Sequence, residues 1–357
     1  MNTIALKPPY LIFLGSETRL TYAKTGAGLV EWRRELCRGQ LNLRADGIDL
    51  GLPQMTLQQA AATGVGSLVI GTASVGGGIS AEWLDTLEQA LLLGLDIVAG
   101  LHGSLTDIPR LQQAAARSGA RLVNVRVPPA ELPVGTGRKR SGRRVLMVGT
   151  DCAVGKKYTA LALARDMRGR GMNADFRASG QTGIMIAGSG LPMDAVVSDF
   201  LAGAAELLSP DNSADHWDVI EGQGGIFHPG YSPVSLGLLL GSQPDAFVVC
   251  HEAGRNYISG WEGFALPTIE QVIERTVALG SLTNPAISCV GASINTSLLP
   301  AGARAGYLEE LSEQLGLPCV DPLQGGTDPL IECLLQLPQA PPTPWGPRNV
   351  EATAKTL

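Results

Sequence analysis

The sequence has few charged residues, and acidic ones outnumber basic ones. Lys, Arg, Asp and Glu make up 17% of its 357 residues, and the formal net charge is −6. A protein that neutralises nucleic-acid phosphates needs a basic face, so we expect no nucleic-acid partner. The 45% hydrophobic content is typical of a compact protein. We expect part of so weakly charged a surface to be covered by a second copy in a homo-oligomer.

Long apolar runs and secretion signals are also missing. No run reaches the roughly 18 residues of a membrane-spanning helix, and residues 1–8 lack the basic-then-apolar pattern of a signal peptide. The six cysteines are scattered without a C-x-x-C pair, so free thiols are predicted. One of them, Cys152, lies where a helix start would stabilise a thiolate, but it is predicted to be a loop-packing residue. We expect a cytoplasmic protein with no membrane partner.

Several cofactor and catalytic motifs are absent. The sequence contains no G-x-G-x-x-G dinucleotide fingerprint, no G-x-S-x-G elbow and no metal-ligand spacing. No resident metal is therefore predicted.

Glycine is abundant and often follows short apolar runs, which is typical of an α/β sheet whose strands turn toward a ligand crevice. In the first half, strands are predicted at 67–71, 96–100 and 121–125, and helices at 81–93 and 108–118. This alternation predicts parallel strands joined by right-handed crossovers. Residues 1–130 are therefore predicted to form a domain that is Rossmann-like in topology only.

Residues 131–144 are predicted to be a linker, because they are rich in proline and glycine. Their basic residues are Arg138, Lys139, Arg140, Arg143 and Arg144. Such a charge run is expected to be solvated, although its place before a phosphate-binding loop leaves a contact with a ligand phosphate open. Residues 338–357 are predicted to form an extended, proline-rich tail.

Residues 145–337 are predicted to form a P-loop NTPase-like domain with a parallel sheet. Strand predictions cover 145–148, 174–177, 218–220, 245–250, 286–290 and 318–320. Because parallel strands end at one edge of a sheet, the residues that follow them are expected to line one crevice. These residues are Gly149, Gln181, Glu221, His251, Asn295 and Asp321.

The strand at 145–148 runs into a glycine-bounded loop and then a helix, which is the pattern of a phosphate-binding loop. Converging backbone N–H groups, the helix N-terminus and the Lys156 cation would hold the phosphates. The Ser or Thr that ordinarily follows this lysine and binds Mg²⁺ is replaced by Lys157, so the loop favours phosphate over metal. The predicted cofactor-binding residues are Gly149, Thr150, Ala153, Val154, Gly155, Lys156, Lys157 and Tyr158, with Asn295 as a partner for an adenine edge.

Two residues are predicted to be catalytic. Glu221 ends a strand and could hold Mg²⁺, act as a general base or orient a loop. His228 lies on the loop that leaves this strand, where an imidazole could exchange a proton near neutral pH or be a hydrogen-bonded bystander. His102 and His251 are expected to be bystanders, and His216 is expected to face solvent.

Four residues are predicted to bind the substrate: Lys24, Gln181, Thr182 and Arg255. Lys24 lies among small residues in an expected loop and could face an acidic ligand group or be an ordinary surface lysine. Gln181 and Thr182 offer an amide and a hydroxyl at a turn. The planar guanidinium of Arg255 could pair with a substrate carboxylate or with Glu252.

The phosphate-binding loop at 149–159, the acidic strand end at 219–225 and the turn at 180–183 together resemble the fold of dethiobiotin synthetase and its relatives. More closely, residues 11–337 resemble the DgcN-type D-glutamate N-acetyltransferase family, across both domains. Further stretches that carry this resemblance are 23–25, 45–47, 71–73 and Tyr257.

This resemblance implies an N-acetyltransferase that moves acetyl from its cosubstrate acetyl-CoA to the amine of D-glutamate, giving N-acetyl-D-glutamate in D-glutamate catabolism. The phosphates of coenzyme A can be held without Mg²⁺, whereas ATP hydrolysis depends on the metal. Glu221 or His228 would be the base, Lys156 would hold phosphate, and Arg255 and Lys24 would bind the two substrate carboxylates.

Two other functions stay open at this point. One is a Mg-ATP-dependent ligase or carboxylase of the dethiobiotin synthetase type, with Mg²⁺ held by Glu221 and Asp151. The other is a nucleotide-sensing regulator without enzymatic activity.

Overall fold

The computed structural model describes residues 2–72 and 78–338, and the chain divides into two compact units. The first unit is Met1–Pro129 with Gly180–Ala195, and the second is Ala130–Ser179 with Val196–Leu357. Both contain a parallel sheet, so the expected α/β class is confirmed. The domain limits predicted from the sequence differ from these units in one main respect. Residues 180–195 belong to the first unit, although the sequence placed them in the second domain.

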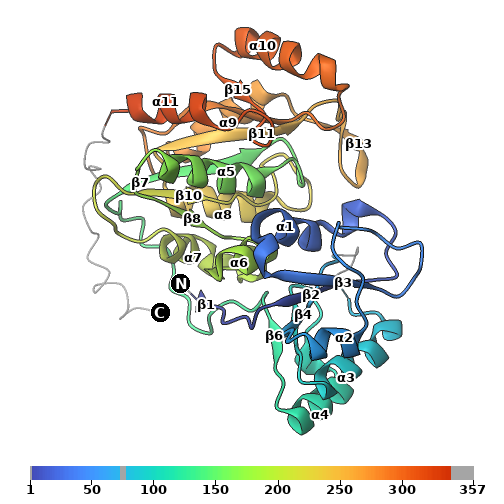
Figure 1. Cartoon of the computed structure of the whole chain (residues 1–357). Coiled ribbons are helices and arrows are strands. Elements are labelled where there is room, and N and C mark those ends of the chain that lie inside the picture. The colour runs from blue at the N-terminus through green and yellow to red at the C-terminus, as the bar shows by residue number, and fades with distance from the viewer. Residues whose placement is uncertain (1, 73–77, 339–357) are drawn as a thin grey trace, which may run out of the picture. The chain divides into compact units, whose positions relative to one another are not determined.

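The first unit is built on a five-stranded parallel sheet in the order β3-β2-β4-β5-β6 (Figure 1). These strands are β2 (Tyr10–Gly15), β3 (Cys37–Asn42), β4 (Ser67–Ile70), β5 (Asp96–Ala99) and β6 (Leu122–Asn124). A short antiparallel pair joins β1 (Asn2–Thr3) to β9 (Ser189–Gly190). The helices are α1 (Lys24–Arg33), α2 (Leu57–Ala62), α3 (Leu84–Leu92), α4 (Pro109–Ser118) and α6 (Gln181–Ala187).

The three strands and two helices predicted for this half are confirmed, whereas β2, β3 and α1 were not anticipated. Helix α1 changes the setting of Lys24, which is the first residue of a helix and not part of a loop. Local sequence explains other boundaries: Thr56 and Gln59 form a capping box at α2, and Gly119 ends α4 in a left-handed conformation.

The second unit is built on a six-stranded parallel sheet in the order β15-β14-β11-β7-β10-β8 (Figure 1). All six predicted strands are confirmed, as β7 (Arg143–Gly149), β8 (Ala174–Arg177), β10 (Trp217–Ile220), β11 (Ala246–Glu252), β14 (Ser288–Asn295) and β15 (Cys319–Val320). A hairpin is formed by β12 (Tyr257–Ile258) and β13 (Trp261–Ala265). The helices are α5 (Lys156–Gly169), α7 (Leu201–Leu208), α8 (Ser232–Ser242), α9 (Ile269–Gly280), α10 (Arg304–Leu315) and α11 (Asp328–Gln336).

The central strand β7 is buried on both faces, which is why it reads as a continuous apolar run. Its Val145 and Met147 pack with α5 and α11 in one core. Helix α8 contacts β7 from its other side, and α9 contacts β11 and β14. The loop at the carboxyl end of β7 therefore starts from a rigid, fully covered strand.

The basic run at 138–144 corrects part of one expectation, because two of its arginines are buried and not solvated, whereas Arg138 is exposed. Arg144 is fully buried and Arg140 is 5% exposed. The Arg144 guanidinium donates to the carbonyl oxygens of Arg140 and Ser141, and that of Arg140 donates to Ser209 and Gly241. Burial lowers the pKa of Arg140 to about 10. Charge density alone gave no sign of these acceptors, which lie in the run itself for Arg144 and at Ser209 and Gly241, far along the chain, for Arg140. Of the predicted tail, residues 339–357 lie outside the described residues.

Candidate active site on the β7–α5 loop

The loop between β7 and α5 has the backbone form of a phosphate cradle. Ala153 and Gly155 are both left-handed, with φ of 56° and 109°, and Gly155 immediately precedes α5. The first N–H groups of α5, from Lys156 to Tyr158, have no preceding helical turn to accept them and lie at the positive end of the helix dipole. This arrangement binds phosphate oxygens in many proteins.

Two glycines allow close packing at this loop, Gly222 from a neighbouring segment and Gly149 from the loop itself. A Cβ on Gly222 would lie 1.6 Å from the carbonyl oxygen of Met147, and a Cβ on Gly149 would lie 2.9 Å from Val154 Cγ2. The chain after β10 consequently passes directly against β7. It places residues 221–228 beside the loop.

Lys156 is buried and points back at this cradle. Its Nζ donates to the carbonyl oxygens of Asp151 and Gly224, each at 2.7 Å. Burial lowers the pKa of Lys156 below its usual value. The ammonium group thus joins the loop to the segment after β10, and it is positioned to exchange these carbonyls for a phosphate.

Asp151 is fully buried and both of its carboxylate oxygens are in use. Oδ1 accepts from the Cys152 backbone N–H at 2.6 Å, and Oδ2 accepts from Arg255 Nη1 at 2.7 Å and from the Ser259 N–H at 2.8 Å. Arg255 also pairs with Glu252, whose other oxygen accepts from Asn295 Nδ2 at 3.0 Å. The expected alternative for Arg255, a pair with Glu252, is present, and Asp151 is a second carboxylate partner that the sequence did not indicate.

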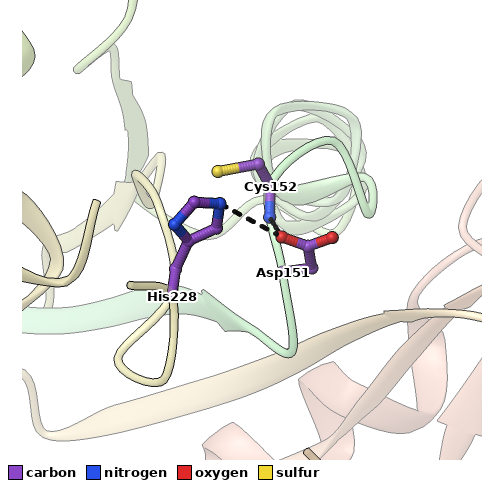
Figure 2. Close-up of side chains that lie close together, drawn as sticks. All are labelled: Asp151, Cys152 and His228. Atoms are coloured by element: carbon purple, nitrogen blue, oxygen red, sulfur yellow. Dashed lines mark hydrogen bonds and ion pairs between the residues drawn. The ribbon is translucent and has the colours of Figure 1, made fainter. Parts of the chain in front are cut away.

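His228 is buried beside Asp151 and Cys152, and Figure 2 shows its ring edge turned toward them. Its Nδ1 accepts from the backbone N–H groups of Gly230 and Tyr231 at 3.1 and 3.2 Å. Its Nε2 lies 3.7 Å from Asp151 Oδ1, which is too long for a hydrogen bond. The rings of Tyr231 and Trp261 lie 4.6 and 4.7 Å away, centroid to centroid. Burial lowers the pKa of His228, Lys156 adds to this effect, and the Asp151 carboxylate opposes it.

Glu221 follows β10 directly and is 4% exposed. Its Oε2 accepts from the Ser179 N–H at 2.9 Å, while the Ser179 hydroxyl donates to the Glu221 carbonyl at 2.6 Å. Gln223 donates to the same hydroxyl at 2.9 Å. Of the three roles considered for Glu221, orientation of a neighbouring loop is therefore visible in the structure.

Two family descriptions match the chain, and together they cover most of it. Residues 37–128 match a Rossmann-like domain and residues 133–331 match a P-loop domain, each described as a domain of unknown function, DUF1611_N and DUF1611_C. The chain belongs to the DUF1611 family.

Relatives of this DUF1611 protein are similar over nearly their whole length. A D-glutamate N-acetyltransferase of Tritonibacter scottomollicae is 45% identical over 329 residues, which is 92% of this chain and 99% of the relative. Another, from a Pseudoalteromonas species, is 44% identical over 326 residues, or 91% and 98% of the two chains. The crystal structure of a DUF1611 family protein from Anabaena variabilis ATCC 29413 is 33% identical, covers 92% of this chain and 99% of its own, and has a TM-score of 0.84.

The loop of this DUF1611 protein fits a divalent metal poorly. Lys157 stands where a P-loop hydroxyl would bind Mg²⁺, and its Nζ lies over the Tyr158 ring at 4.5 Å. The nearby Thr159 hydroxyl is bonded to Gly155 O and to Ser293 Oγ. Asp151, the other expected ligand, already accepts from three donors. The donor set therefore suits an anion that arrives without a metal ion.

The predicted substrate residues of the first unit take part in contacts within that unit. The Thr182 and Thr25 hydroxyls are 3.1 Å apart, and the Gln181 amide, oriented to satisfy both partners, donates to Gly100 O and accepts from Arg126 Nη2. Gln181 begins α6, which follows β8 in the chain and belongs to the first unit. Lys24 is exposed.

Two further histidines are hydrogen-bonded within the second unit. His216 is buried and not solvent-facing, since its ring lies 3.0 Å from Asn173 Oδ1 and 3.2 Å from Asp218 Oδ1. His251 Nδ1 lies 3.2 Å from the Thr150 hydroxyl, and burial lowers the pKa of this histidine. In the part of the chain that the structure describes, no helix has the length and apolarity to cross a membrane.

Sequence reasoning missed Ser259, Tyr231 and Trp261 as parts of the site. Ser259 holds Asp151 through its backbone, so its side chain could give no signal. The two aromatic residues pack on His228. Tyr231 is only three residues from His228 in the sequence, so it could have been predicted to lie near the ring, whereas Trp261 gave no such signal.

Proposed function

We propose that this protein is an N-acetyltransferase that moves the acetyl group of acetyl-CoA to the amine of D-glutamate: the C–N bond of N-acetyl-D-glutamate forms, the thioester C–S bond breaks, and coenzyme A leaves as the thiol. The proposal rests on the near end-to-end similarity, at 44–45% identity, to relatives named D-glutamate N-acetyltransferase. The chemistry of the loop supports it, because its donors suit an anion without a metal. Coenzyme A brings a diphosphate and a further phosphate to such a site.

In this proposal the phosphates of coenzyme A lie on the loop at 149–158. The backbone N–H groups at the start of α5 donate to them, and Lys156 replaces its carbonyl partners with a phosphate oxygen. Asn295 donates to Glu252 and accepts from the Ser297 N–H. If Asn295 binds adenine, a hydrogen bond to the base would replace one of these two bonds.

The amine of the acceptor must lose a proton before it attacks the thioester. Glu221 is the better candidate for the base, because a carboxylate has several lone pairs and can accept a proton while its Oε2 keeps the hydrogen bond from the Ser179 N–H. His228 is a poorer candidate, since its accepting nitrogen Nδ1 is already bonded to two backbone N–H groups. Lys24, Gln181, Thr182 and Arg255 remain predicted contacts for the substrate.

The test is formation of N-acetyl-D-glutamate, measured by mass spectrometry, from acetyl-CoA and D-glutamate in the presence of EDTA. We expect turnover without metal, and Glu221→Gln should lower kcat by at least about a hundredfold if Glu221 is the base. L-glutamate and Mg-ATP serve as the comparison substrates. Product formation that requires Mg-ATP, with none from acetyl-CoA, would overturn the proposal in favour of a ligase.

We also propose a cytoplasmic homo-oligomer that acts on small molecules only. The weakly charged composition supports an oligomer, and so do large apolar side chains that are exposed, among them Leu20, Val197 and Leu298. Sedimentation velocity of the purified protein measures the oligomeric state directly, and a single monomer peak at micromolar concentration would contradict this part.

A further inference from the structure

The hydrogen bonds of His228 fix which nitrogen carries the proton. Backbone N–H groups can only donate, and two of them, from Gly230 and Tyr231, point at Nδ1 at 3.1 and 3.2 Å. Nδ1 must therefore be the unprotonated nitrogen. In the neutral ring the proton therefore lies on Nε2, and the ring presents a hydrogen-bond donor, not a base, to the β7–α5 loop.

This donor has no hydrogen-bond partner among the described residues. The side chain of His228 is fully buried, Nε2 has no hydrogen-bond partner, and Asp151 Oδ1 is 3.7 Å away. Figure 2 shows Nε2 pointing at the start of the β7–α5 loop, beside Asp151 and Cys152. A buried donor without a partner costs free energy, and a ligand oxygen in the loop would satisfy it.

Proton uptake by this ring is opposed from several sides. A charged imidazolium would need a hydrogen on Nδ1, which would face the two N–H groups that now donate there. The ring is also packed between Tyr231 and Trp261 and lies near the Lys156 cation. The one group that favours the charged ring, Asp151, is ion-paired with Arg255, which weakens its effect on the imidazole.

The same geometry argues against a metal on Asp151, Cys152 and His228, although their ligand atoms lie within 4.8 Å of one another. A metal at Nε2 would require the ring proton to move to Nδ1, where it would face the N–H groups of Gly230 and Tyr231. An anion can accept from Nε2–H without moving this proton. It would also be attracted by Lys156 and by the N-terminus of α5.

We propose that His228 is a neutral hydrogen-bond donor that binds a phosphate oxygen of the ligand on the 149–158 loop through Nε2–H, and that it is not the general base. The inference rests on the proposed function only for the identity of that ligand, coenzyme A. The hydrogen-bond pattern around the ring holds for any oxyanion in the loop.

The first test is the protonation of the ring itself. The chain has four histidines, so nitrogen-15 spectra of the labelled protein can be assigned by comparison with His228→Gln. We expect one histidine with its proton on Nε2 throughout pH 5.5–8 and no titration in that range. A His228 signal that titrates near pH 6.5, or that carries its proton on Nδ1, overturns the inference.

The second test separates a donor from a base by two substitutions. Glutamine places an N–H donor near the position of Nε2 but cannot act as a base, whereas alanine removes both functions. We expect His228→Ala to raise the Kd for coenzyme A and for inorganic pyrophosphate by about tenfold to a hundredfold, measured by calorimetric titration. His228→Gln should recover most of the affinity that His228→Ala loses, because its amide N–H takes the place of Nε2–H.

Controls keep these outcomes distinct. His102→Gln changes an exposed histidine of the first unit and should alter neither Kd, and circular dichroism checks that each variant is folded. Equal Kd values for wild type and His228→Ala overturn the inference, as does a His228→Gln enzyme that binds normally but has lost turnover. If pyrophosphate binds in a His228-dependent way while coenzyme A does not bind, the donor role is supported and the proposed function fails.

Discussion

Replacing Lys156 by methionine should weaken ligand binding strongly while changing the stability of the ligand-free protein little. The ammonium is buried and donates to two carbonyl oxygens, those of Asp151 and Gly224. Methionine keeps most of the length of the side chain and removes the charge and its donors. Desolvation of an ammonium costs on the order of several kcal/mol, and each charge-assisted bond offsets about 1.5–3 kcal/mol of that cost. We therefore expect the free energy of unfolding to change by less than about 2 kcal/mol.

The ligand-bound state has no such compensation. Loss of the bond from the ammonium to a phosphate oxygen costs about 1.5–3 kcal/mol, which raises Kd about tenfold to more than a hundredfold. At 100 times the wild-type Kd, the ligand stabilises the wild-type protein by about 2.7 kcal/mol. After a hundredfold loss, the same concentration contributes RT ln 2, or about 0.4 kcal/mol.

The assay is thermal unfolding with and without coenzyme A, supported by calorimetric titration. Lys7→Met is the matched control, because it makes the same substitution at an exposed lysine. An unchanged Kd for coenzyme A in Lys156→Met would refute the phosphate cradle. A large loss of stability in ligand-free Lys156→Met would instead refute the argument that the desolvation cost of the ammonium and its two hydrogen bonds nearly cancel.

Further outcomes follow from the same structure. Because burial lowers the pKa of Lys156, the wild type should gain stability relative to Lys156→Met as pH rises from that lowered value toward the usual 10.5, which denaturant titrations across pH can measure. Gly222→Ala should destabilise the protein by about 3 kcal/mol or more, since its Cβ would lie 1.6 Å from Met147 O, while Gly263→Ala, with open space around its Cβ, should be nearly neutral in the same unfolding assay. Burial raises the pKa of the Cys250 thiol to about 11, so peptide mapping after iodoacetamide treatment of the native protein at pH 8 should find Cys250 unmodified, and rapid modification there would contradict its burial.

Most of the elements and the character of the loop could be predicted from the sequence. Buried parallel strands read as continuous apolar runs, so all six strands of the second sheet were found, and Gly149, Lys156 and Lys157 defined a phosphate loop without a metal-binding hydroxyl. These features are local: a few neighbouring residues suffice to specify a strand, a turn and a helix start. Weaker runs, such as β2 and β3, escaped notice.

Only the tertiary structure decided which groups face one another. Asp151 meets Arg255 from 104 positions away and lies 3.7 Å from His228, and these contacts leave Asp151 saturated and His228 with one free donor. Arg144 is likewise fully buried, and its guanidinium donates both to nearby carbonyl oxygens, such as that of Arg140, and to that of Pro210, which is 66 positions away. Hydrogen-bond partners and burial depend on how separate segments pack in space, and residue type alone does not carry that information.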